Sequence, residues 1–395
     1  MRRLATILAV ATSLVSFSTA IADKEIKVGG TAFAEWFYDM SDTLAYSRSQ
    51  VIYGTDDFDA YGVFDITRAY LFAKAKMSEK TWGKVNIDVN PSNNNVWLKN
   101  AFIDWKFFSQ ESFDVSTRLG LQGTPWISQM DATWARRYVE KTPSDQLGMQ
   151  TSADFGLSFG SNLGENGRWG YARLAFFNGT SYTSPTENNP TKDINLAVFI
   201  DPLNANPDLA ETKVGFQFYS GTLNSYSDSA QVKDDFKKTM FSVMGNLQYR
   251  KILGVGLEYN SYKSPQILDV LALRDRGLYA LPNFWQADTS DNSISAITIF
   301  GTLWFAELAE NTQFLKTTDI FFRFMMVDPD GDNHDLGGGI NFGTSGTELI
   351  FGLECAPVDG VAASFNYRDE KIKDIPNRSD DVDNYYLYLN MVLDF

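Results

Sequence analysis

Apolar and polar side chains alternate along many segments of this chain, each about ten residues long. In the last segment, every second residue from Tyr385 to Phe395 is apolar, whereas Asn390 and Asp394 lie on the opposite parity. This period of two is that of a β-strand with one polar and one apolar face. Runs of this length are longer than an average soluble strand and fit a tilted membrane crossing. The pattern predicts an all-β protein, a transmembrane antiparallel β-barrel.

The same alternation recurs along most of the chain and predicts about sixteen strands, an even number as in single-chain bacterial barrels. Their expected ranges are 26–39, 61–77, 82–90, 96–107, 113–123, 151–160, 168–178, 192–201, 211–220, 238–249, 252–263, 294–307, 317–327, 347–356, 361–370 and 384–395. Short connections such as 78–81 and 250–251 alternate with long polar ones such as 40–60 and 264–293. Short turns at one rim and long loops at the other are typical of outer-membrane barrels. The short connection 91–95 and the longer 202–210 depart from that alternation.

The first 22 residues have the pattern of a secretory signal peptide. Arg2 and Arg3 precede an apolar run from Leu4 to Phe17, and Ala20-Ile21-Ala22 provides small residues at a cleavage site. No polar stripe interrupts Leu4 to Val10, as it would in an amphipathic helix, and the apolar run is too short to span a membrane. We therefore expect a signal peptide at 1–22, and at 23–395 one barrel domain exported to the bacterial outer membrane.

Composition agrees with a barrel and argues against several other classes of protein. Aromatic residues make up 14 % of the chain, and a barrel places such residues on its lipid face and in interfacial girdles. The formal net charge is −15 and argues against nucleic-acid binding. The single Cys355 allows no intramolecular disulfide, and the single His334 lies in a polar loop among aspartates. A Ser-His-Asp site or a multi-histidine zinc site is therefore not expected, and we predict neither an enzyme nor a bound cofactor.

The parity of the strands directs charged side chains of both signs into the lumen, where they would set selectivity. The inward cations are Arg68, Lys74, Lys76, Lys106, Arg118, Arg173, Arg323 and Arg368, and the inward carboxylates are Asp88, Asp104, Asp114, Asp154, Asp193, Glu258, Glu348 and Glu354. Solvation of the wall by mutual ion pairs is the alternative role for any one of them. Anion and cation preference both remain open from the sequence.

The connection 124–150 is the candidate constriction, because it is long and holds Trp126, Trp134, Arg136, Arg137 and Lys141 among polar residues. The chain resembles the trimeric porins, in particular the phosphate-selective and general porin group. The residues that carry this resemblance are Arg68-Ala69-Tyr70-Leu71, Leu119-Gly120-Leu121-Gln122, Ser152-Ala153-Asp154-Phe155-Gly156 and the terminal Phe395. The resemblance implies that the third external loop folds inward, with Arg136, Arg137 and Lys141 at the narrowest point, and that the protein is a homotrimer.

Two further segments leave alternatives open. Asp328 to Asp335 has carboxylates at alternate positions around a glycine, as calcium loops do, but Gly339 stands where the bidentate glutamate belongs. An acidic turn is the alternative, and we predict no metal site. The loop 264–293 either covers the mouth of the barrel or contacts a neighbouring molecule.

The function that this pattern favours is passive diffusion of small hydrophilic solutes or ions through a porin. The expected partners are outer-membrane lipids, lipopolysaccharide and those solutes. The alternatives are a non-conducting structural or adhesive barrel, a soluble exported lectin, and an outer-membrane hydrolase, which the single histidine disfavours.

Overall fold

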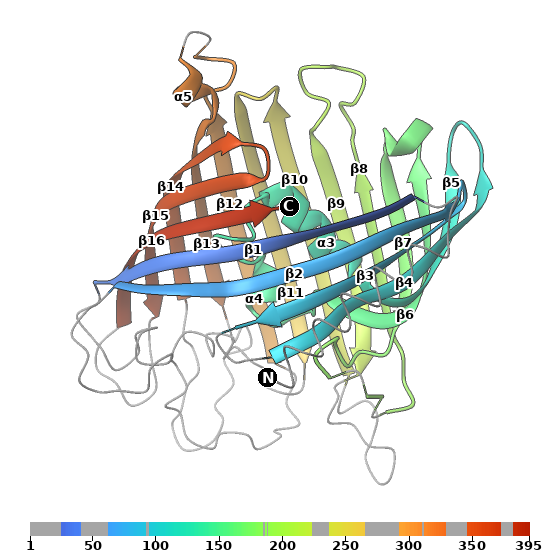
Figure 1. Ribbon diagram of the computed structural model, residues 1–395. Coiled ribbons are helices and arrows are strands. Elements are labelled where there is room, and N and C mark those ends of the chain that lie inside the picture. Colours follow the sequence, from blue (N-terminus) through green and yellow to red (C-terminus); the bar gives the residue numbers. More distant parts are fainter. Residues whose placement is uncertain are drawn as a thin grey trace, which may run out of the picture.

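Sixteen antiparallel strands form one closed barrel in which each strand pairs with its neighbours in sequence and β1 pairs with β16 (Figure 1). The computed structural model describes residues 25–40, 62–91, 95–184, 186–187, 189–222, 237–264, 292–309, 312–328, 346–372 and 382–395. The predicted fold class and strand number are therefore confirmed.

The strands run the full circuit of the barrel in chain order. They are β1 (Glu25–Asp39), β2 (Gly62–Ser78), β3 (Thr81–Asn90), β4 (Asn95–Ser109), β5 (Asp114–Gly123), β6 (Ala153–Leu163), β7 (Gly170–Phe177), β8 (Asp193–Ile200), β9 (Lys213–Thr222), β10 (Lys237–Tyr249), β11 (Leu253–Ser264), β12 (Asn292–Trp304), β13 (Thr318–Asp328), β14 (Gly346–Val358), β15 (Val361–Ile372) and β16 (Val382–Asp394). The helical elements are α3 (Pro125–Trp134), α4 (Pro143–Gln146), α5 (Gln313–Lys316) and the 3-10 turn η2 (Glu165–Gly167).

Most boundaries lie within a few residues of those predicted, with the largest differences at two turns. β12 ends at Trp304 rather than at 307, and α5 follows it within the turn to β13. β6 extends to Leu163, where η2 begins the turn to β7. The end of β12 was predicted too late because Phe305 and Ala306 continue the apolar run beyond the last paired residue. The end of β6 was predicted too early because the polar Ser161 and Asn162 interrupt the alternation.

The two faces of the barrel separate as the sequence pattern predicts. On β16, Leu389, Met391 and Leu393 are exposed on the outer face, whereas Tyr386 and Tyr388 are buried on the inner face. On β8, Ile194 and Ile200 are exposed on the outer face and Asn195 is buried inside. The outer surface is therefore apolar, and the interior holds the polar groups.

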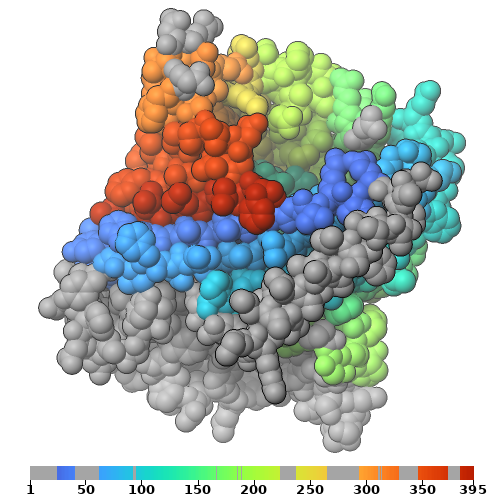
Figure 2. All heavy atoms as spheres, in the orientation of Figure 1, coloured from blue at the N-terminus to red at the C-terminus, as the bar shows by residue number. Residues whose placement is uncertain are grey.

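The chain closes the barrel at its own C-terminus, where Figure 2 shows β15 and β16 lying against β1 and β2. The backbone N–H of Phe395 donates to the carbonyl of Gly30 at 2.9 Å, and the Gly30 N–H donates to the carbonyl of Phe395 at 2.8 Å. A Cβ at position 30 would lie 2.5 Å from the Phe395 ring, so this close approach requires glycine.

In the described part of the chain, no helix is long and apolar enough to cross a membrane. The predicted signal peptide at 1–22, His334, residues 329–335 of the acidic segment and most of the loop 264–293 lie outside the described residues.

Candidate constriction of the lumen

The segment 124–150 lies within the ring of strands, and its first half is the helix α3 (Figure 1). Pro125 occupies the first helical turn, where its missing N–H costs no hydrogen bond, and Ala135 ends the helix in the left-handed region with φ 60°. Trp126, Met130 and Trp134 are spaced by four residues, so they share one face of the helix, and all three are buried.

The two tryptophans fasten α3 to the inner wall. The Trp126 ring stacks on Phe199 of β8 with centroids 5.2 Å apart, and its Nε1 donates to Glu258 of β11 at 2.9 Å. Trp134 makes edge contacts with Phe300 of β12 and Phe321 of β13, each at 6.0 Å between centroids. The apolar face of α3 therefore packs on β8 and on β11 to β13.

Arg136 adds charged contacts between the segment and the wall. Its Nε lies 3.1 Å from Glu354 and its Nη2 lies 3.5 Å from Asp319, while Nη1 donates to Thr302 at 2.9 Å. Only 3 % of Arg136 is exposed. The expectation that Arg136 faces the passage is therefore wrong, because its guanidinium is buried in ion pairs with the carboxylates of the wall.

Two arginines of the wall reach back to the second half of the segment. Arg323 of β13 donates to the backbone carbonyl of Lys141 and pairs with Glu348 at 3.0 Å. Arg368 of β15 pairs with Glu140 at 2.6 Å and donates to the carbonyl of Val139 at 2.9 Å. The inward direction predicted for Arg323, Arg368 and Glu348 agrees with these contacts, which join the segment to the wall.

Arg137, unlike Arg136, keeps its partners within the segment. Its guanidinium pairs with Asp131 at 2.7 Å and with Asp145 at 2.6 Å. Burial alone would raise the pKa of Asp145. The positive charges of Arg137, Lys141 and Lys99 have the larger effect, so the pKa of Asp145 lies below its usual range. Burial raises the pKa of Asp131 above its usual range in spite of Arg137.

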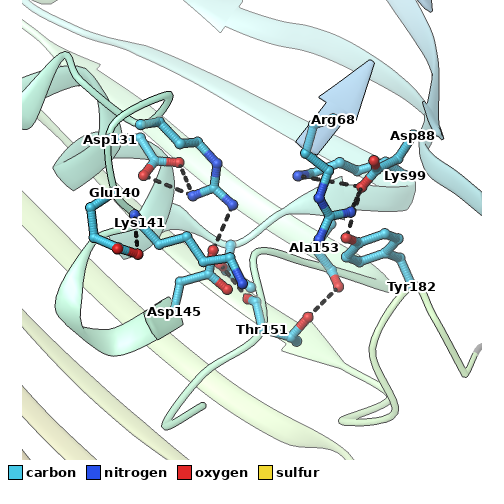
Figure 3. Close-up of polar contacts among 12 residues, drawn as sticks. Arg68, Asp88, Lys99, Asp131, Glu140, Lys141, Asp145, Thr151, Ala153 and Tyr182 are labelled. Carbon is cyan, nitrogen blue, oxygen red and sulfur yellow. Dashed lines mark hydrogen bonds and ion pairs between the residues drawn. The ribbon is translucent and has the colours of Figure 1, made fainter. Parts of the chain in front are cut away.

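A second charged group lies on the wall opposite, as the two sides of Figure 3 show. Arg68 of β2 pairs with Asp88 of β3 at 2.8 Å, and Lys99 of β4 lies 4.0 Å from the same carboxylate. The hydroxyl of Tyr182 also donates to Asp88, at 2.9 Å. One carboxylate is therefore shared by two cations.

Further along β2 to β7, cations outnumber carboxylates. Arg118 pairs with Asp104 at 2.9 Å, and Lys106 pairs with Asp114 at 2.8 Å. Lys74 of β2 stands directly opposite Lys84 of β3 in the strand register. Arg173 of β7 donates to the hydroxyl of Ser158 at 2.9 Å.

Asp154, the remaining predicted residue of the lumen, does not contribute to this surface. It is 1 % exposed and accepts hydrogen bonds from the backbone N–H groups of Phe155 at 2.7 Å and Gly179 at 2.8 Å. Its role in the structure is to hold the start of β6 against the connection that follows β7.

Two cations on the wall of β3 and β4 were missed by the sequence interpretation. Lys84 has the same parity as Asp88 and could have been found by continuing the alternation. Lys99 lies where the register of β3 and β4 shifts, between Asn100 and Leu98, and such a bulge reverses parity without a clear signal in the sequence. Among the described residues, no cluster of histidine, cysteine and acidic side chains could hold a metal ion.

No family model matches the sequence, and no curated protein is a significant match. Among solved structures, the outer membrane channel DcaP of Acinetobacter baumannii is similar over 95 % of this chain and 98 % of its own, with a TM-score of 0.59 and 11 % identity. The fold is that of the bacterial outer-membrane porins.

Two more outer-membrane structures agree over nearly their full length. The anion-selective porin from Comamonas acidovorans has a TM-score of 0.58 and 8 % identity, and the match covers 94 % of this chain and 100 % of that porin. The trimer form of OmpT, an outer membrane protein of Vibrio cholerae, has a TM-score of 0.56 and 11 % identity over 94 % of this chain and 99 % of its own. The porin fold is therefore retained with very little sequence identity.

Proposed function

We propose that this protein is an outer-membrane porin, a water-filled channel through which small hydrophilic solutes or ions diffuse passively. The carrying observation is the position of segment 124–150, which is attached on one side to the wall of β8 and β11 to β15. A sixteen-stranded barrel encloses an aqueous lumen. A segment fastened along one side narrows such a lumen, and the charged side chains of β2 to β5 then line the other side.

The constriction we propose is formed by Arg137, Asp131 and Asp145 on the segment and by Arg68 and Lys99 on the wall. Lys141 joins the segment's side, because its positive charge acts on Asp145. Arg136 holds the segment to the wall through its ion pairs and does not face the solute. Charge at such a point acts strongly, because every solute passes within a Debye length, about 8–10 Å at ordinary salt.

The surroundings of the barrel belong to the same proposal. The exposed apolar outer face fits outer-membrane lipids and lipopolysaccharide, and the signal-peptide pattern at 1–22 fits export. The porin fold suggests a channel rather than an enzyme. We also propose a homotrimer, since the outer face of β1, β2 and β16 carries small and apolar side chains including Ala69 and Ala73.

Recording from planar bilayers tests the proposal. The purified protein, inserted without any added substrate, should give stepwise conductance increases of constant size. Repeated insertions that remain silent would favour the alternative, a non-conducting structural or adhesive barrel.

A further inference from the structure

Segment 124–150 covers the carboxylates of one half of the inner wall. Glu258 accepts a hydrogen bond from Trp126, and Glu354 pairs with Arg136 at 3.1 Å and also accepts from the hydroxyl of Tyr138. Glu348 accepts a hydrogen bond at 3.0 Å from Gln146 of the segment. These acidic groups are thereby neutralised or removed from the passage.

The other half of the inner wall, on β2 to β5 and β7, forms what we call the basic wall. It consists of seven cations, Arg68, Lys74, Lys84, Lys99, Lys106, Arg118 and Arg173, together with the three carboxylates that pair with them, Asp88, Asp104 and Asp114. Among these ten residues, seven positive charges against three negative charges leave an excess of four. The basic wall therefore carries a strong positive field on the side that the segment leaves open.

Three cations of the basic wall account for most of this excess. Within the described parts of the chain, no carboxylate oxygen lies within 4.0 Å of Lys74, Lys84 or Arg173. Like charges directly opposite one another on neighbouring strands are destabilising, and Lys74 and Lys84 have this arrangement. Both ammonium groups lie over the Phe72 ring, at 5.6 and 5.5 Å from its centroid, which offsets part of the repulsion. Mobile anions from solution can offset the rest.

The segment itself does not reverse this field. Its carboxylates Asp131 and Asp145 share Arg137, and Lys141 adds a second positive charge beside Asp145. Glu140 is paired with Arg368 of the wall at 2.6 Å. The charges of the segment therefore nearly cancel, and those of the basic wall dominate.

We propose that the passage is anion-selective, and that Lys74, Lys84 and Arg173 are the residues that set this preference. The inference rests on the proposed channel function and identifies the class of solute. The net charge of −15 on the whole chain does not oppose it. Only charges within about 8–10 Å of the passage act on a permeating ion at ordinary salt.

The reversal potential in a gradient of potassium chloride tests this proposal on the full barrel. The parent channel should give a chloride-to-potassium permeability ratio above one. Lys74→Glu should lower that ratio several-fold, and it should fold well because the new carboxylate stands opposite Lys84. Lys316→Glu on the exposed α5 makes the same change of charge outside the lumen and should leave the ratio unchanged.

Each outcome decides a separate point. A conducting parent that prefers potassium would overturn the anion inference while leaving the channel function standing. Equal ratios for Lys74→Glu and Lys316→Glu would show that the basic wall does not set the preference. If Lys74→Glu does not insert, Lys74→Gln and Arg173→Gln each remove one charge and should both lower the ratio. A parent that never conducts overturns the proposed function and the inference together.

Discussion

Arg136 and Arg137 follow one another in the chain, but their guanidinium groups have different partners. Arg136 joins Glu354 and Asp319 of the wall, whereas Arg137 joins Asp131 and Asp145 of its own segment. The sequence could place this basic pair in a long connection with tryptophans. It could not say which arginine would find carboxylates behind it, because those carboxylates lie more than 180 residues away along the chain.

The structure predicts a specific effect of removing Arg136. Arg136→Gln leaves Glu354 and Asp319 without their cation, and an unsatisfied buried polar group costs about 1–3 kcal/mol. Hydrogen exchange of residues 125–147 should therefore accelerate, measured by mass spectrometry. The matched change Arg250→Gln removes a half-exposed ion pair to Glu307, worth less than about 1 kcal/mol, and should leave this segment unaffected. Equal exchange in the two variants would mean that Arg136 does not hold the segment.

The two carboxylates beside Arg137 predict a pH dependence of selectivity. The pKa of Asp131 is raised by burial and that of Asp145 lies below its usual range, so Asp131 is protonated first as the pH falls. Protonation removes a negative charge from the constriction and leaves Arg137 paired with Asp145. The reversal potential should therefore shift toward anions, beginning above the ordinary range of an aspartate carboxyl. Asp131→Asn should show the shifted value already at neutral pH and lack this step, and a step of the same size in that variant would contradict the assignment.

At the scale of elements, strands were easier to predict than the helix inside the barrel. Each strand separates an apolar outer face from a polar inner face, so its period of two is visible without knowledge of its neighbours. The helix α3 was not predicted, although Trp126, Met130 and Trp134 have helical spacing and Pro125 precedes them. A ten-residue helix is marginal alone, and this one is stabilised by packing on Phe199, Phe300 and Phe321, which only the closed barrel brings together.

If α3 narrows the lumen, its attachment to the wall should determine the width of the passage. Trp126→Ala removes a fully buried ring and the hydrogen bond to Glu258, a loss of about 3–5 kcal/mol for a buried tryptophan. The helix should leave the wall, and sugars of varied size in a liposome-swelling assay should show a changed exclusion limit. Trp169→Ala, in the exposed turn between η2 and β7, should leave that limit as it is. An unchanged limit in Trp126→Ala would mean that α3 does not narrow the lumen.

At the scale of the whole molecule, the outer surface predicts where copies of the barrel meet. Phe64 is 83 % exposed beside a groove of about 430 Å³ lined by Trp36, Ile66, Leu389 and Met391, on β1, β2 and β16. Loss of a large ring from an interface costs affinity, whereas its loss toward lipid costs little, because lipid fills the space. Phe64→Ala should therefore shift native mass spectra in mild detergent from trimer toward monomer. Phe241→Ala, on the outer face of β10 half-way around the barrel, should leave the trimer intact. A parent protein that is monomeric throughout would refute the trimer, and two variants that dissociate equally would place the interface elsewhere.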